Sequence, residues 1–434
     1  MNIVVLMLDS LRPDHVGCYG NEEVKTPHLD RLAREGTIFT RAYAEYPITV
    51  PSRTALVSGD FTFTNRPWCP LRGYDLHIAE ILKEQGYVTA AFSDTPFSTG
   101  AGMDRGFDTF EFFAMGKCHK PIVEGRTADI SDAYFPPGTP EVEVNYYRNT
   151  ATNRQYCMEE FGAYCPELIT RAVEGWLDDH RRDTFLLWVD HFNPHEPWDP
   201  PPPYDRMYQP DYDGRYIPMP VGPDCSWMTE EDRQHVLANY KGCVTETDEH
   251  VGRVIGRLRQ LDLLDDTLVV VISDHGEPFC EHGTIRKYGV PVYDELSRMV
   301  FMLRKPGLVW EGLVCDALVE NTDLLPTVAD MLDIGLPRRV DGLSLSPLLR
   351  GEADSIRDKA YMGGFNLRSA VRTDEWKFID HRGERPNELF DMNDDPAEKR
   401  NLAERQPTLV KELHRDLWEF HRKWSHMLSW RDEQ

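Results

Sequence analysis

This sequence contains no C-x-x-C pair, and no apolar run reaches the ~18 residues that a membrane-spanning helix requires. Its nine cysteines are odd in number and irregular in spacing, a pattern that suggests neither a disulfide framework nor a cysteine zinc site. No charged segment followed by an apolar one precedes the first apolar run, residues 2–8, so no secretory signal is predicted. We therefore expect reduced thiols, a cytoplasmic location and no association with a membrane.

Positive charge is also scarce. Lys and Arg number 48 against 73 Asp and Glu, which gives a formal net charge of −25. Binding to nucleic acid needs clustered basic residues that neutralise phosphates, so we expect no nucleic-acid partner. The surplus of acid is explained by solubility alone. A chain of this composition that handled an anionic substrate would need local positive charge, from a metal ion or from a few buried Arg, Lys and His residues.

Apolar residues make up 41% of the 434 residues, which is enough for a substantial core. They fall into alternating strand and helix patterns with no internal repeat. Strands are predicted over residues 2–10, 87–94, 184–192 and 266–276, and helices over residues 26–36, 75–86, 165–180 and 229–264. This alternation predicts a doubly wound α/β sheet whose functional residues lie at the carboxyl ends of the strands.

The character of the sequence changes near residue 355. Beyond it, residues 369–381 and 387–392 are typical of hairpin strands and residues 407–424 of an amphipathic helix, so the predicted domains are 1–355 and 356–434. Two segments of the first domain have no clear period. Residues 95–160 are expected to form insertion loops, and the Pro- and Tyr-rich residues 197–214 are expected to form either a surface loop or the wall of a substrate pocket.

Acidic residues end two of the predicted strands. Asp9 follows the first strand, and Asp274 and His275 follow a later one. A carboxylate at such a place can simply cap the next helix, but an adjacent Asp–His pair is costly to bury without partners. Two carboxylates and an imidazole can hold a divalent metal, and the hydroxyl of Thr49, in the segment "ITVPSRTALVSG", can complete the set. We therefore predict a metal site formed by Asp9, Thr49, Asp274 and His275.

Three basic residues are candidates for the local positive charge. Arg53 lies one helical turn after Thr49, so both can face one pocket. His195 lies in a proline-bounded loop after a strand, and Lys287 lies in a loop beyond Asp274. Each also has a simpler interpretation: an exposed ion pair for the arginine, a structural histidine and an ordinary surface lysine. In a shared pocket they would stabilise an anionic ester.

Several segments resemble those of one known family. They are "NIVVLMLDSLRPDHVGCYG", "TPHLDRLAREGTIFTRAY", "VPSRTALVSG", "NPHEPW", "VTETDEHVGRVIGRL", "DTLVVVISDHGE", "NTDLLPTVADMLDI", "DGLSLSPLL" and "NELFDMNDDPAEKRNLA". In this order, from residue 2 to about residue 403, the sequence resembles the sulfatase family of the alkaline phosphatase superfamily. The resemblance implies an alkaline-phosphatase-like α/β fold, with a large, mixed and mostly parallel sheet flanked by helices. It also implies a small C-terminal subdomain with an antiparallel sheet and a helix.

The resemblance also implies roles for single residues. By position, Asp9, Asp274 and His275 match metal ligands, Thr49 matches the nucleophile and Arg53 matches the arginine that orients it. His195 and Lys287 match groups that hold the ester anion and assist the leaving group. The predicted substrate-binding set is Arg53, Asn65, His195 and Lys287.

This chain departs from ordinary sulfatases, which have Asp-Asp after the first strand and Asp-Asn after the later one. It has Asp9-Ser10 and Asp274-His275 instead. Both changes resemble the branch that contains phosphonate monoester hydrolases, phosphodiesterases and choline sulfatases.

Thr49 is a further departure. Sulfatases oxidise a Cys or Ser at this position to formylglycine, an aldehyde that threonine cannot form because of its methyl group. A metal-bound threonine can still attack phosphorus, as other branches of the superfamily imply. We therefore predict a hydrolase of phosphodiesters or phosphonate monoesters that requires Mn²⁺ or Zn²⁺, with Ca²⁺ less favoured, and no formylglycine.

Two alternatives stay open: a sulfatase that uses Thr49 directly, and an inactive binding protein that keeps the fold. The expected partner is a small anionic ester, and self-association into a homo-oligomer is left open.

Overall fold

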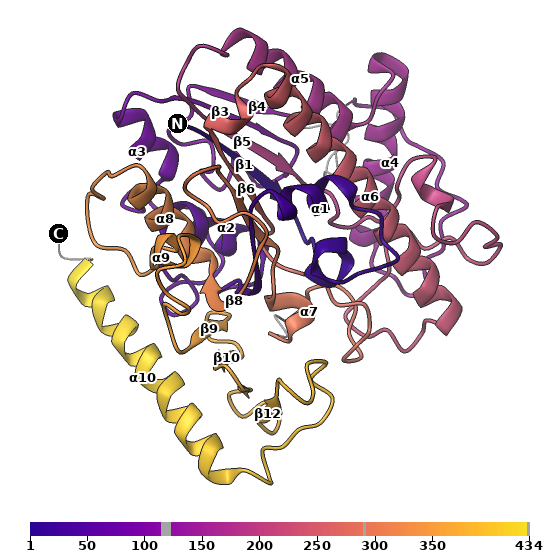
Figure 1. The fold of residues 1–434 in the computed structure, drawn as a ribbon. Coiled ribbons are helices and arrows are strands. Elements are labelled where there is room, and N and C mark those ends of the chain that lie inside the picture. The colour runs from indigo at the N-terminus through magenta and orange to yellow at the C-terminus, as the bar shows by residue number, and fades with distance from the viewer. Residues whose placement is uncertain (114–122, 290–291, 432–434) are drawn as a thin grey trace.

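The structure, a computed structural model, describes residues 1–113, 123–289 and 292–431, with the side chains of the last helix described up to residue 423. An eight-stranded sheet forms its centre, in the order β4-β3-β5-β1-β6-β7-β2-β8. The strands are β1 (Asn2–Leu8), β2 (Thr37–Tyr43), β3 (Val88–Ser93), β4 (Thr109–Phe112), β5 (Phe185–His191), β6 (Thr267–Ile272), β7 (Phe301–Arg304) and β8 (Leu313–Glu320). Strand β7 runs antiparallel to both of its neighbours, and the other neighbours pair in parallel. The predicted mixed, mostly parallel sheet is confirmed (Figure 1).

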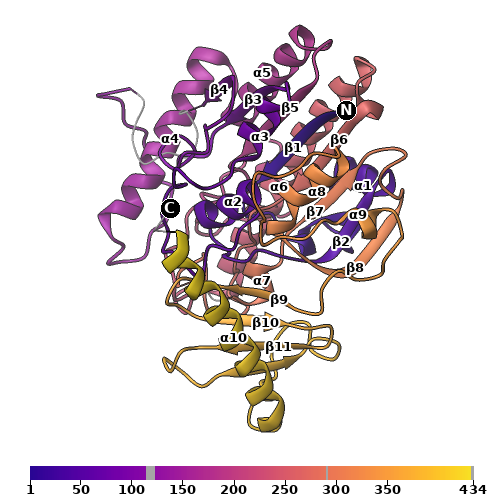
Figure 2. The same ribbon diagram turned by 90° about the vertical axis from the view of Figure 1, so that its left-hand side faces the viewer.

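Helices cover both faces of this sheet, as Figure 2 shows. The helices are α1 (Pro27–Arg34), α2 (Thr49–Ser58), α3 (Ile78–Glu84), α4 (Glu141–Phe161), α5 (Cys165–Asp179), α6 (Glu230–Gln260), α7 (Asp294–Ser297), α8 (Leu324–Met331) and α9 (Ser346–Leu349). Short 3₁₀ turns span Pro13–His15, Gly17–Tyr19, Tyr204–Arg206, Leu264–Asp266 and Asn321–Asp323. Alternate residues of β1 point to opposite faces. Val4 and Leu6 pack with α1, α5 and α6, whereas Ile3 and Val5 pack with α2, α3, α8 and α9. Burial on both faces explains why the central strands are continuous apolar runs.

The C-terminal part forms a second sheet in the order β12-β11-β10-β9. Its antiparallel strands are β9 (Ala360–Gly363), β10 (Ser369–Arg372), β11 (Trp376–Asp380) and β12 (Glu388–Asp391), followed by helix α10 (Pro407–Arg431). Leu413 and Leu417 of α10 pack on Val371, Phe378 and Leu389. The predicted small sheet and helix are thus confirmed, and they lie together at one end of the molecule (Figure 1). The domain boundary at residue 355 stays a prediction.

The expectation of insertion loops over residues 95–160 is wrong in part, because the segment contains β4 and the helix α4; residues 114–122 lie outside the described residues. The buried side of α4 carries Tyr146, Thr150, Asn153 and Cys157, which follow one another at helical spacing. Only the first and last of these are hydrophobic, so a pattern of apolar residues does not reveal the helix. Asn and Thr are also weak helix formers, which conceals it further.

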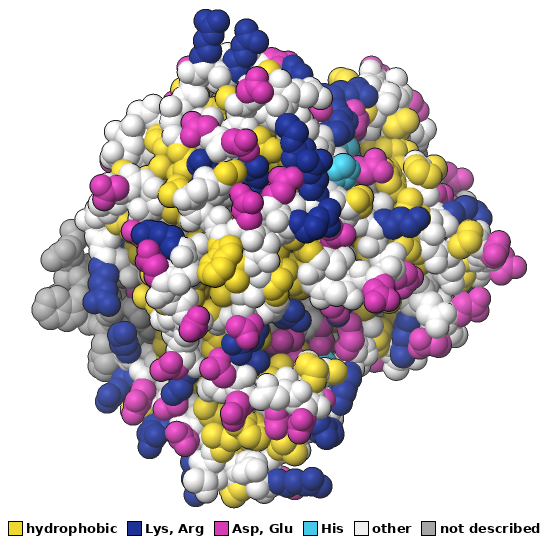
Figure 3. Space-filling model, in the orientation of Figure 1, with side chains coloured by type: hydrophobic (Ala, Val, Ile, Leu, Met, Phe, Trp, Pro, Cys, Tyr) yellow, Lys and Arg dark blue, Asp and Glu magenta, His cyan; other side chains and the backbone are white. Residues whose placement is uncertain are grey.

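The surface carries both signs of charge. On the face drawn in Figure 3, basic and acidic side chains are interspersed. Within the described residues, no helix has the length and apolar character that a membrane span requires.

Candidate active site

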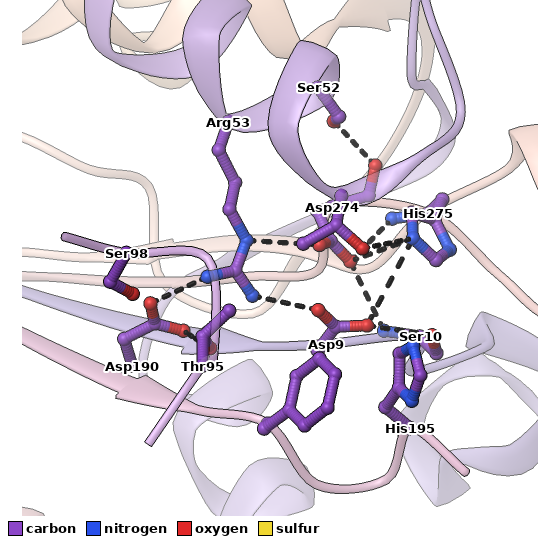
Figure 4. A network of polar contacts seen from close by, with 12 residues as sticks. Asp9, Ser10, Ser52, Arg53, Thr95, Ser98, Asp190, His195, Asp274 and His275 are labelled. Atoms are coloured by element: carbon purple, nitrogen blue, oxygen red, sulfur yellow. Dashed lines mark hydrogen bonds and ion pairs between the residues drawn. The ribbon is translucent and has the colours of Figure 1, made fainter. Parts of the chain in front are cut away.

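Strand register places two carboxylates of the predicted metal site side by side. Strands β1 and β6 are parallel neighbours with Met7 opposite Ile272, so Asp9 and Asp274, two positions further along, leave the sheet together. Ligand atoms of Asp9, Asp274 and His275 all lie within 4.8 Å of one another, and the three residues are fully buried. The structure therefore brings these three predicted ligands together at the carboxyl edge of the sheet (Figure 4).

The imidazole of His275 is oriented for metal binding. Its Nδ1 lies 2.7 Å from the carbonyl oxygen of Gly276, which can only accept, so Nδ1 carries the proton. The other nitrogen, Nε2, is left with a lone pair and lies 3.9 Å from Asp9 Oδ1. Burial lowers the pKa of His275 to about 4, helped by the charge of Lys287 and opposed by Asp274. The ring is therefore neutral at pH 7, which is the form that binds a metal.

The two carboxylates respond differently to their surroundings. Burial and the charge of Asp274 raise the pKa of Asp9 well above its usual range, against the opposing effect of Arg53. Burial also acts to raise the pKa of Asp274, but His275 and Arg53 outweigh it and lower the pKa to about 2. A raised pKa marks a carboxylate short of positive charge. Two buried carboxylates and a neutral imidazole fit a divalent cation, which would supply that charge.

Thr49 lies at the start of α2, beside this cluster. The Thr49 side chain is 3% exposed, and its Oγ1 lies 3.3 Å from Nε2 of His275. The preceding residue, Ile48, offers no side chain that could cap the helix. The positive end of the helix dipole therefore faces the site, which favours an anion at that point. The structure thus brings Thr49 beside the predicted metal ligands, and its role as the nucleophile stays a prediction.

Arg53, one turn further along α2, contacts three carboxylates. Its Nε donates to Asp274 at 3.1 Å, one terminal nitrogen donates to Asp9 at 2.9 Å and the other donates to Asp190 at 2.5 Å. Burial acts against the charge of Arg53, but the carboxylates outweigh it and raise its pKa. Ser93 and Thr95 donate to Asp190 in turn, at 3.0 Å each. Arg53 is therefore a buried positive charge that joins the carboxylates of the predicted metal site to Asp190 (Figure 4), and its predicted contact with substrate stays a prediction.

Lys287 is buried between two glutamates. Its ammonium donates to Glu277 at 2.7 Å and to Glu196 at 3.0 Å. Burial opposes the charge of Lys287, but Glu196 and Glu277 outweigh it and raise the pKa, so the ammonium stays protonated. Burial and the charge of Glu196 raise the pKa of Glu277 to about 7. The lysine is therefore not an ordinary surface residue.

Thr49, His195 and Lys287 share one cavity of about 320 Å³. The His195 ring stacks on Phe192 with centroids 4.0 Å apart, and its Nδ1 lies 2.6 Å from the carbonyl oxygen of Glu196. Asn65 is not among the residues that line this cavity, and its amide donates to the carbonyl of Phe61 at 2.9 Å. Three of the predicted residues therefore line one cavity, and Asn65 does not line it.

Sequence reasoning missed three acidic residues of the site: Asp190, Glu196 and Glu277. Each stands next to a residue or motif already singled out. Asp190-His191 ends β5 just as Asp274-His275 follows β6, and the glutamates occur in "PHEP" and "DHGE". An Asp–His pair at the end of each of two strands was a usable signal for Asp190.

Comparison with known proteins agrees with this geometry. A family model described as Sulfatase matches residues 1–334, and one described as N-sulphoglucosamine sulphohydrolase, C-terminal, matches residues 280–423. A protein named Arylsulfatase from Clostridium perfringens is 27% identical over 447 residues, covering 92% of this chain and 90% of the relative. An Ulvan-active sulfatase from Formosa agariphila is 28% identical over 425 residues, covering 92% and 76%.

Among solved structures, a phosphonate monoester hydrolase of Agrobacterium radiobacter has a TM-score of 0.78 at 22% identity, covering 98% of this chain and 96% of that one. This likeness shows the alkaline-phosphatase-like fold. The chain belongs to the sulfatase family and is a hydrolase of ester bonds. The fold family depends on divalent metal, in keeping with the cluster of Asp9, Asp274 and His275.

Proposed function

We propose that this protein is a metal-dependent hydrolase of phosphodiesters or phosphonate monoesters that uses Thr49 as its nucleophile. The observation that carries the proposal is the position of the Thr49 hydroxyl. It lies at the N-terminus of α2, 3.3 Å from the Nε2 of His275 and in the lining of the cavity. Threonine cannot form the aldehyde on which sulfatases rely, so the hydroxyl itself has to attack.

Each residue of the site has its own role in this proposed reaction. Thr49 Oγ1 loses its proton to solvent and attacks phosphorus in line, and the bond between phosphorus and the leaving ester oxygen breaks. The phosphorylated or phosphonylated threonine that forms is then hydrolysed by water. His195 and Lys287, in the cavity lining, donate hydrogen bonds to the oxygens of the ester, and one of the two protonates the leaving group. Asp9, Thr49, Asp274 and His275 would hold the metal. When bound, a divalent cation lowers the pKa of the hydroxyl.

The charge of the site favours substrates with a single negative charge. Its carboxyl groups, Asp9, Asp190, Asp274, Glu143, Glu196 and Glu277, outnumber the cations Arg53, Arg286 and Lys287. A divalent ion would offset most of this excess but would leave little attraction for a dianion. Phosphodiesters and phosphonate monoesters carry one charge, whereas phosphate monoesters carry two at neutral pH.

We therefore expect kcat/KM for bis(p-nitrophenyl) phosphate and for p-nitrophenyl phenylphosphonate to exceed that for p-nitrophenyl phosphate by about 10-fold or more. Initial rates at pH 7.5 with Mn²⁺ measure this, and p-nitrophenyl sulfate is included as the fourth ester. Turnover of the sulfate ester alone would overturn the proposal. No turnover of any ester would favour a binding protein, although the intact cluster around Thr49 argues against that function.

A sulfatase that uses Thr49 directly is the second candidate. Its support is that the curated relatives described above are named sulfatases. Release of sulfate from a sulfated threonine would be slow without an aldehyde. Attack of Thr49 on a phosphorus ester is therefore favoured over attack on a sulfate ester.

The types of ligand also favour certain metal ions over others. Two carboxylates, one imidazole and one hydroxyl suit Mn²⁺ or Zn²⁺, and the imidazole makes Ca²⁺ less favourable. We expect protein stripped with EDTA to bind one Mn²⁺ per chain. At a concentration 100-fold above the dissociation constant, the ion should stabilise the fold by about 2.7 kcal/mol and raise the melting temperature by a few degrees.

Elemental analysis after dialysis and a thermal melt measure both effects. Asp274→Asn should abolish them, and Asp265→Asn, on the exposed turn before β6, should leave both intact. Binding of Mn²⁺ to the Asp274→Asn variant at unchanged affinity would contradict the assignment.

A further inference from the structure

The cavity beside Thr49 has a mostly apolar lining. Its polar and charged lining residues are Thr49, Glu143, His195, Glu196, Arg286 and Lys287, and the others are apolar or aromatic: Ile48, Trp68, Phe97, Val142, Tyr146, Phe192, Met219 and Tyr288. Sugar rings need several hydrogen-bonding partners, whereas walls of this kind favour flat or branched apolar groups.

The other charged groups of the wall are already paired. Arg286 donates to Glu196 at 2.9 Å and to Glu143 at 2.7 Å, and the Tyr288 hydroxyl donates to Glu143 at 2.9 Å. Little of the wall is therefore left to recognise the hydroxyl groups of a sugar.

The first turns of α4 supply part of this wall. Val142 is 66% exposed although it is apolar, and Tyr146 follows it one turn later, so both face the cavity from the same side of the helix. A ligand in the cavity would cover the exposed valine and remove its side chain from water.

The same turn is connected to the segment that carries Lys287. Glu143 accepts hydrogen bonds from Arg286 and Tyr288, the two residues on either side of Lys287. Arg286 has a φ of +63°, a left-handed conformation that a non-glycine residue adopts at some cost and that needs support from its contacts. Arg286 also reaches Glu196, which binds Lys287. Glu143 therefore fixes the segment that carries the lysine.

We propose that the first turns of α4 select esters with a bulky apolar group, and that Glu143 is a positioning residue that links this wall to Lys287. The selected ligand is a singly charged anion joined to an aromatic or branched alkyl group, rather than a sulfated sugar. The part that concerns Lys287 rests on the proposed function, whereas the selection of the apolar group can be tested by binding alone.

Binding of inert anions tests the selection without turnover. Calorimetry with metal-loaded protein compares benzenesulfonate, methanesulfonate and glucose 6-sulfate. Benzenesulfonate should bind about 10-fold tighter than the other two, and Val142→Asn should remove most of that difference while methanesulfonate binds as before. Val314→Asn, at another exposed valine that does not line this cavity, is the matched control. Equal binding of the three anions, or an advantage of benzenesulfonate that survives Val142→Asn, would overturn the selection.

Leaving-group dependence tests Glu143. In Glu143→Gln, kcat should fall by about 10-fold for a phenyl ester and much less for the p-nitrophenyl ester, because only the poorer leaving group depends on a well-placed Lys287. Glu141→Gln, on the exposed side of the same turn, should behave like the wild type. An equal loss with both esters, or no loss, would overturn the positioning role. If no ester is turned over while benzenesulfonate is still preferred, the proposed function fails and the selection of apolar groups stands.

Discussion

Replacement of Thr49 by alanine is expected to lower kcat by about 1000-fold or more on every ester that the protein cleaves. The reason is that the proposed attacking group is the Thr49 hydroxyl, 3.3 Å from His275, and alanine has nothing to replace it. Steady-state rates measure the effect. Mass spectrometry of acid-quenched protein should detect an adduct on the peptide that contains Thr49 in the wild type and none in the variant.

Two controls separate chemistry from folding. Thr49→Ser keeps the hydroxyl and should retain most of the activity. Thr54→Ala removes another buried hydroxyl of α2, one that donates to the carbonyl of Val50 at 2.9 Å and does not line the cavity, so its kcat should change little. Full activity of Thr49→Ala would show that another group attacks.

Arg53→Ala is expected to cost about 3–5 kcal/mol of the free energy of unfolding. The guanidinium is 3% exposed and contacts Asp9, Asp190 and Asp274, so its loss leaves three buried carboxylates without their counter-charge. Arg53→Lys should restore only part of the stability. The single ammonium group of lysine cannot donate to all three carboxylates in the directions that the planar guanidinium group of arginine reaches. Urea denaturation in the presence of EDTA, which removes any compensating metal, measures the change.

The loss of stability should also depend on pH. Burial already raises the pKa values of Asp9 and Asp190 in the wild type, and removal of Arg53 raises them further. A carboxylate with a raised folded pKa is neutral below that pKa and contributes to stability there, a contribution that is lost as the pH rises through it. The variant should therefore lie closer to the wild type at pH 5 than at pH 8.

Arg31→Ala is the matched control for Arg53→Ala. Arg31 is exposed and pairs with Glu35 on the surface, so its removal should change stability by less than about 1 kcal/mol. A similar small loss in Arg53→Ala, at both pH values, would contradict the role given to the buried arginine.

The sequence was most informative where one physical rule applied along a continuous segment. The apolar runs that became β1 and β6 had to be central strands, because burial on both faces requires uninterrupted apolar residues. The acidic residues that follow those runs had to meet at one edge, since parallel strands end on the same side. Helix α4 was not predicted from the sequence, because its buried side carries Tyr, Thr and Asn and so shows no apolar periodicity.

The sequence alone determined the alternation of strands and helices and the predicted ligands at the strand ends, because these depend on residue type and local order. Its resemblance to the sulfatase family implied the complete fold and the position of Thr49. Only the tertiary structure decided that Arg53 binds three carboxylates, that Lys287 lies between Glu196 and Glu277, and that Val142 of α4 lines the cavity. These contacts join residues far apart in the chain. They exist only after the strands are in register and the loops have packed, and no local pattern encodes which side chain will meet which.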